Sequence, residues 1–119
     1  MIKTILCDID GTLMFHHGNI KDLMKEEPVV LDGTLEKIDE WNAKGYNIIL
    51  VTGRKESLRS ITVNQLEKCG IIYDQLIMGL GGGQRVLIND LKPNPENPNN
   101  PTAVSFNVVR NEGIKNIEV

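Results

Sequence analysis

The apolar and polar positions of this chain change period several times, which predicts short strands separated by helices. Stretches rich in apolar residues, typical of buried strands, occupy residues 5–7, 46–51, 75–78, 86–88 and 103–109. Strands that alternate with helices indicate right-handed crossovers and a mostly parallel sheet. The pattern therefore predicts an α/β fold, specifically a three-layer α/β/α sandwich of the Rossmann-like type.

Two helices are expected between the first three strands. The apolar stripe of the first helix consists of Leu35, Ile38 and Trp41. Asp32 or Thr34 is available as its N-cap, and Gly45 as its terminator. The apolar stripe of the second helix consists of Leu58, Ile61, Thr62, Leu66 and Cys69. Gly70 would close this second helix.

Two segments fit no regular element. Residues 12–31 include a His16-His17 pair, and exposed loop histidines are the ordinary interpretation of such a pair. Residues 92–102 carry four of the five prolines, which favours an extended or turning surface loop. This loop either lines the rim of a functional site or is a long solvated connection, and the sequence leaves both interpretations open.

Length and charge limit the possible classes of protein. A chain of 119 residues is expected to form one domain over residues 1–119. The formal charge of −3 and the lack of a basic run make nucleic acid an improbable partner. No run approaches the ~20 apolar residues of a membrane span, so no membrane partner and a cytoplasmic location are expected. Cys7 and Cys69 lack ligand spacing and are interpreted as small core residues.

The strongest chemical signal is the sequence Asp8-Ile9-Asp10-Gly11-Thr12, directly after the first apolar run. Residues two apart in a strand point to the same side, so Asp8 and Asp10 begin on one side of the chain. Neighbouring carboxylates repel each other unless a cation or a shared proton relieves the repulsion. A magnesium site is the simplest explanation, because Mg²⁺ prefers oxygen ligands. The alternative is a strand that ends in an ordinary acidic turn.

Two further runs end in polar groups. Residues 46–51 are followed by Thr52, Gly53 and Arg54, and residues 86–88 by Asn89-Asp90. Open α/β sheets bind ligands at the carboxyl ends of their strands, which favours a functional site over the acidic turn. The glycines at 81–83 lack the lysine and the following helix of a nucleotide-binding loop.

With these motifs the chain resembles the haloacid dehalogenase superfamily of phosphotransferases, over residues 1–92. Asp8 to Thr12 match its first motif, DxDGT, Thr52 matches the second, and Asp90 fits the acidic fourth. Two features depart from the pattern. Residues 79–85 contain no lysine for the third motif, and Asn89 stands where a first acid often precedes Asp90.

The resemblance implies a phosphatase mechanism. Asp8 would be the nucleophile that forms an aspartyl-phosphate, and Asp10 the general acid and base. Magnesium would be held by Asp8, the main-chain carbonyl of Asp10, and Asp90. Thr52 would donate its hydroxyl to phosphate, with Gly53 and Arg54 beside it.

The missing lysine leaves the phosphate-binding cation open. Lys92 is the preferred substitute because some relatives carry a lysine just after the fourth-motif acid, and Arg54 and Arg85 are the reserves. Each of these side chains has a simpler interpretation as a solvated residue.

Spacing also bears on the substrate. Members of the superfamily insert a cap domain after the first or the second motif, and neither interval has room for one here. Residues 12–31 would instead form a flap over the site. A capless phosphatase acting on a sugar phosphate or related small metabolite, as a homo-oligomer whose neighbour covers the open site, is the first expectation. The alternatives are a phosphatase of a polynucleotide end or phosphoprotein, and a non-catalytic phosphate-sensing or phospho-accepting module. Asp10 argues against the last, because a stable phospho-acceptor gains nothing from a second acid.

Overall fold

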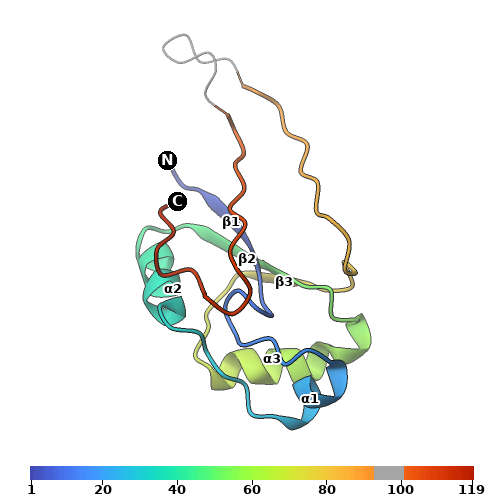
Figure 1. Cartoon of the computed structure of the whole chain (residues 1–119). Helices are drawn as coiled ribbons and strands as arrows, with labels where there is room; N and C mark the ends of the chain where they lie inside the picture. The colour runs from blue at the N-terminus through green and yellow to red at the C-terminus, as the bar shows by residue number, and fades with distance from the viewer. Residues whose placement is uncertain (93–100) are drawn as a thin grey trace.

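The computed structural model describes residues 1–92 and 101–119 of the chain. It contains three short strands and three α-helices with one 3₁₀ turn, in an order that alternates between them (Figure 1). The elements are β1 Thr4–Asp8, α1 Ile20–Lys25, α2 Thr34–Ala43, β2 Asn47–Val51, η1 Glu56–Leu58, α3 Arg59–Lys68 and β3 Gln75–Ile77. The helix and strand expectations for residues 5–78 are therefore confirmed, and α1 is an addition inside the expected flap.

The three strands form one parallel sheet in the order β1-β2-β3. Asp8 pairs in register with Val51, and Val51 with Ile77, so the carboxyl ends of all three strands lie side by side. The residues that follow these ends therefore meet at one edge of the sheet, as the sequence pattern predicts.

The core lies on one face of this sheet. Alternate strand residues, Ile5 and Cys7 in β1 with Ile48 and Leu50 in β2, are buried together with side chains of α2 and α3. A sheet that grows in one direction through right-handed crossovers carries both crossover helices on the same face. The opposite face, which includes Leu6, stays partly exposed. Within the described residues the expected three-layer sandwich is therefore not formed, because no helix covers this second face.

The strands expected at residues 86–88 and 103–109 are not formed. Both stretches are irregular and largely exposed. After β3, the chain forms a glycine-rich turn at residues 79–83. It then continues as an extended segment that runs away from the helices (Figure 1). Residues 78–85 are fewer than the roughly a dozen that a parallel crossover takes, which explains why the apolar run does not re-enter the sheet. Most of the proline-rich loop, residues 93–100, lies outside the described residues.

The start of α2 also differs from the expectation. Gly33, with φ of 86°, is the N-cap, and the Thr34 hydroxyl instead donates to the Leu13 carbonyl across 2.9 Å. A Cβ at position 33 would lie 2.1 Å from the Lys115 side chain, so the C-terminal segment packs directly on this turn. Gly45 and Gly70 follow α2 and α3 with positive φ, as expected.

The last residues of the chain pack back on the core. Ile114 is fully buried, and Val108, Ile117 and Val119 lie against the core. In the described residues, no helix is long and apolar enough to cross a membrane.

Candidate functional site

Asp8 is the carboxylate that faces the joint carboxyl end of the sheet. It is half-buried, and Thr12 donates its hydroxyl to Asp8 Oδ2 at 3.4 Å. Burial raises the pKa of Asp8 above that of an ordinary aspartate, although the N–H of Ile9 and the positive charge of Arg85 act in the opposite direction. A nearby cation therefore helps to keep Asp8 in the ionised form that a nucleophile requires.

The loop after Asp8 is a tight turn closed by backbone hydrogen bonds. Thr12, Leu13 and Met14 all donate to the Ile9 carbonyl, at distances from 2.9 to 3.2 Å. Gly11 adopts a φ of 86°, which the turn requires and which L side chains rarely adopt. The DxDGT motif thus encodes the local shape of the turn as well as its two carboxylates.

Thr52 lies buried just beyond β2, as expected, but its backbone N–H is engaged in a hydrogen bond within the sheet. Its N–H donates to the Ile77 carbonyl at 3.0 Å and continues the ladder to β3. Its hydroxyl oxygen accepts a bond from the Arg54 N–H at 3.1 Å, which leaves the hydroxyl proton to be donated. The hydroxyl of Thr52 can therefore serve a phosphate, whereas its own N–H cannot.

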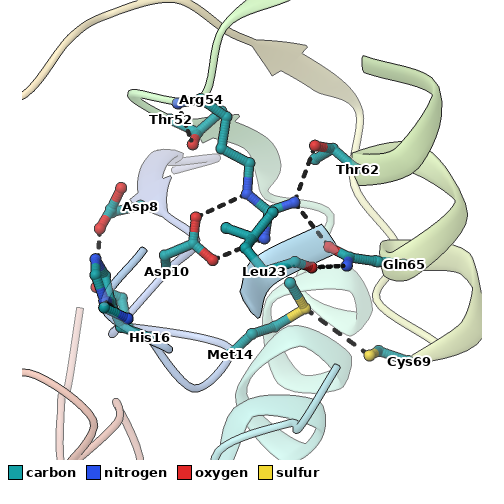
Figure 2. Close-up of polar contacts among 12 residues, drawn as sticks. Asp8, Asp10, Met14, His16, Leu23, Thr52, Arg54, Thr62, Gln65 and Cys69 are labelled. Atoms are coloured by element: carbon teal, nitrogen blue, oxygen red, sulfur yellow. Dashed lines mark hydrogen bonds and ion pairs between the residues drawn. The ribbon is translucent and has the colours of Figure 1, made fainter. Parts of the chain in front are cut away.

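Arg54 is held by Asp10 and by two side chains of α3, and its assignment as a phosphate-binding residue stays a prediction. Its Nε and Nη2 donate to the two oxygens of Asp10 at 2.8 and 2.7 Å, as Figure 2 shows. Its Nη1 donates to the Thr62 hydroxyl at 2.9 Å and to Gln65 Oε1 at 2.7 Å. Only 5% of the side chain is exposed. The physical reason is that a buried guanidinium needs partners for its fixed fork of donors, and Asp10 with α3 supplies them.

The same contacts constrain Asp10. Both carboxylate oxygens accept bonds from Arg54, in a bidentate pair that holds the carboxyl group in one orientation.

Asp90 and Lys92 are not brought to the site. Both are exposed on the extended segment after the glycine-rich turn, and the Thr102 hydroxyl donates to the main-chain oxygen of Asp90. Over residues 1–92 and 101–119, no three His, Cys, Asp or Glu side chains lie close enough to hold a metal ion. Asp90 therefore lies on a segment that does not join the sheet, and the magnesium set of Asp8, the Asp10 main-chain carbonyl and Asp90 stays a prediction.

The glycine-rich turn is fastened to the end of β2. Gly79 donates to the Arg54 carbonyl at 2.7 Å, and Leu80 to the Thr52 carbonyl at 3.1 Å. A Cβ on Gly53 would lie 2.7 Å from the Gly81 carbonyl oxygen, so this approach needs a glycine. Gly53 thus has a packing role, and the turn holds Arg85 where its charge acts on Asp8.

No sequence pattern indicates a contribution from the C-terminal segment. Asn111 accepts a bond from the His16 N–H at 2.7 Å, across 95 residues of sequence, and its own N–H donates to the Gly11 carbonyl at 2.8 Å. A Cβ on Gly11 would lie 3.2 Å from the Arg110 side chain. The aliphatic part of the Arg110 side chain therefore packs beside the first motif. Only the tertiary structure reveals it, because no local pattern marks it.

Comparisons with known proteins identify the family and the type of fold. The family model of the LNS2 domain of PITM 1–3 matches residues 5–84, and no curated protein matches the chain. The Pnkp1/Rnl/Hen1 complex shares 26% identity and a TM-score of 0.57, over 71% of this chain and 31% of that one. D,D-heptose 1,7-bisphosphate phosphatase from B. bronchiseptica, complexed with magnesium and phosphate, shares 19% identity and a TM-score of 0.53, over 68% of this chain and 51% of that one. A Vibrio cholerae protein shares 21% identity and a TM-score of 0.53, over 82% and 87%.

The chain thus spans about a third and about half of the first two of these structures. The family model reaches from β1 through the first motif and the end of β2 to the glycine-rich turn, more than half of the chain. The chain belongs to the LNS2 domain family, and its fold is of the haloacid dehalogenase type.

Proposed function

We propose that the protein is a phosphomonoester phosphatase that acts through an aspartyl-phosphate on Asp8. The placement of Asp8 carries this proposal. It lies at the carboxyl edge of the sheet beside the Thr52 end of β2, and the charge of Arg85 favours its ionised form. The fold shared with a solved phosphatase supports the same class of reaction.

In the proposed reaction, a carboxylate oxygen of Asp8 attacks phosphorus and the bond to the ester oxygen breaks. The leaving alkoxide takes a proton from Asp10. Water then attacks the aspartyl-phosphate while Asp10 accepts its proton, which releases phosphate and restores both carboxyl groups. The Arg54 contacts fix the orientation of the Asp10 carboxyl group for both proton transfers. Aryl phosphates, whose leaving groups need no proton, should be the better substrates.

Arg85 replaces Lys92 as the proposed phosphate-binding cation. Arg54 is occupied by Asp10, and Lys92 is exposed beyond Asp90, whereas the charge of Arg85 acts on Asp8. Arg110, against Gly11, is the second candidate. A positive charge here would neutralise the transferring phosphoryl group.

Magnesium remains the proposed activator, since a solved neighbour holds magnesium and phosphate. The described residues offer it the Asp8 carboxylate and the Asp10 carbonyl, while Asp90, the third expected ligand, is exposed on the segment after the glycine-rich turn. Bound Mg²⁺ would supply positive charge to the phosphate oxygens. We assign no step of the reaction to it.

A sugar phosphate or related small metabolite is the proposed substrate, with a homo-oligomer as the arrangement that covers the open site. The acidic balance of the chain supports a small substrate over nucleic acid. A phosphorylated polynucleotide end is the second candidate, because the chain shares 29% identity with the Pnkp1/Rnl/Hen1 RNA repair complex.

Phosphate release with Mg²⁺ from p-nitrophenyl phosphate, a panel of sugar phosphates and a 3′-phosphorylated oligonucleotide tests the proposal. Asp8→Asn should abolish release and leave the fold intact, because an amide oxygen is a poor nucleophile. Near-normal release by Asp8→Asn would exclude the covalent route. Phosphate binding without release in the unaltered protein would instead identify a phosphate-sensing module.

A further inference from the structure

Arg54 connects the site to a distant part of the chain through its second edge. One edge of the guanidinium holds Asp10, and the Nη1 atom of the other holds Thr62 and Gln65 on α3. The two sets of bonds share one rigid plane (Figure 2). A rotation that breaks the α3 contacts therefore also changes the bonds to Asp10.

Gln65 extends this connection to α1. Its Nε2 donates to the Leu23 carbonyl at 2.9 Å, while its Oε1 accepts from Arg54. Helix α1 has no buried residue, and its six residues are too few to be stable on their own. The bond from Gln65 is thus a principal attachment of α1 to the body of the protein.

The segment around α1 closes over Arg54. A cavity of about 10 Å³, room for one water molecule, separates the segment from the guanidinium. Its lining consists of Met14, Phe15, His17, Leu23, Glu26, Pro28, Arg54 and Gln65. His17 Nε2 is buried there with no partner among the described residues. Residues 15–28 therefore lie over the Arg54 side chain. The contact between them is small, and it leaves His17 Nε2 without a hydrogen bond among the described residues.

We infer that Arg54 is a positioning residue that couples the seating of residues 15–28 to the orientation of Asp10. When the segment is seated, Gln65 is fixed by Leu23 and in turn fixes Arg54. When the segment leaves, the Gln65 amide loses its acceptor and rotates more freely, and the Arg54 fork loses one of its supports. The catalytic consequence rests on the proposed function, whereas the physical coupling does not.

Hydrogen exchange tests the coupling without reference to catalysis. Gln65→Leu should speed exchange of the amides of residues 20–26 by about tenfold, the effect of one lost hydrogen bond. Asn64→Leu, at an exposed position on the same helix, is the matched control and should have no effect.

Arg54→Lys is the decisive variant, because Arg54 makes no bond to α1. A lysine keeps the charge next to Asp10 but loses the fork, so exchange at residues 20–26 should still rise several-fold. Unchanged exchange at these amides in folded Arg54→Lys, with faster exchange in Gln65→Leu, would overturn the inference and reduce the Gln65 contact to a local attachment.

Gln65→Glu separates the two contacts of Gln65. The carboxylate keeps an acceptor for Arg54 but has no N–H for Leu23. It should release α1 as Gln65→Leu does, yet retain more activity.

If the protein is a phosphatase, Gln65→Leu and Arg54→Lys should lower kcat more for alkyl phosphates than for p-nitrophenyl phosphate, with KM nearly unchanged. Equal losses on both substrates would overturn the link to Asp10. Absence of activity in the unaltered protein would count against the proposed function alone, since the exchange results still decide the coupling.

Discussion

Burial decides which of the polar residues at the strand ends remain available for chemistry. Thr52 and Arg54 are two residues apart and both buried, but the threonine keeps a free hydroxyl proton while the arginine is fully engaged by Asp10 and α3. A buried guanidinium without partners would be very costly, so its internal contacts outweigh any role toward solvent. Arg85 stays exposed and is therefore the cation left for a substrate.

The cation assignment predicts an unequal effect of two substitutions. Arg85→Met should lower kcat/KM for p-nitrophenyl phosphate by about 10- to 100-fold, since a charged contact near the phosphoryl group contributes roughly 1.5–3 kcal/mol. Lys92→Met should change it less than about twofold. Steady-state kinetics on both variants give the answer, and the reverse order would restore Lys92 as the cation.

Cys7 gives a prediction about pH. Burial raises the pKa of its thiol to about 12, from an ordinary value of 9.0. The folded state keeps the proton that the unfolded state loses above pH 9, so the free energy of unfolding should fall as pH rises from about 9 toward 12. Urea unfolding near pH 8 and near pH 10 measures this fall, and Cys7→Ala should reduce it.

Iodoacetamide should modify the half-exposed Cys69 before Cys7 in the folded protein, and equal rates would contradict the burial of Cys7.

At the scale of elements, the site depends on how two turns pack together. The turn after β2 and the glycine-rich turn after β3 are joined by two backbone hydrogen bonds and by the close approach of Gly53 to Gly81. Neither turn alone fixes the direction of the chain that follows. Their contact determines where Arg85 lies.

Gly53→Ala should disturb this contact. The new Cβ would lie 2.7 Å from the Gly81 carbonyl oxygen, and backbone cannot yield as cheaply as a flexible side chain. We expect a loss of about 1–3 kcal/mol in stability and a fall in phosphate affinity as Arg85 moves. Gly82→Ala, with open space around its Cβ, is the control. Thermal unfolding and phosphate titration should separate the two variants, and equal behaviour would mean that the close contact carries no weight.

At the scale of the whole molecule, the chain leaves much apolar surface uncovered. Val86, Leu87 and Ile88 expose 74%, 58% and 88% of their area, and Leu6 on the open face of the sheet exposes 50%. Val86, Leu87 and Ile88 are consecutive, and an exposed apolar stretch on a small protein commonly marks an interface. It supports the proposal that a second copy covers part of the molecule.

Ile88→Lys tests this expectation. Sedimentation should show the unaltered protein as a dimer or larger at micromolar concentration, and Ile88→Lys should shift it toward the monomer. Val63→Lys, at an exposed position on α3, should leave the assembly unchanged. If the unaltered protein stays monomeric over the whole concentration range, the proposal that a second copy covers the open site loses its support.

Local sequence patterns are enough to predict the fold up to residue 78 and the edge of the sheet where Asp8 and Thr52 meet. The apolar runs and helical stripes up to residue 78 act locally, so their periods specify β1, α2, β2, α3 and β3 and place Asp8 and Thr52 at one edge. The motif DxDGT likewise specified its own turn, because glycine there adopts a φ that few other residues reach.

The contacts of each polar side chain depend instead on how distant elements pack together. Arg54, predicted from the sequence to bind phosphate, is the partner of Asp10 in the structure. Its guanidinium is also held by Thr62 and Gln65 of α3. Residues 86–88 look like a strand, but a strand needs a neighbour to pair with, and the short turn after β3 does not lead the chain to one. Asn111 reached the first motif across 95 residues. Contacts between residues distant in sequence leave no local periodicity, so they are decided by how the elements pack.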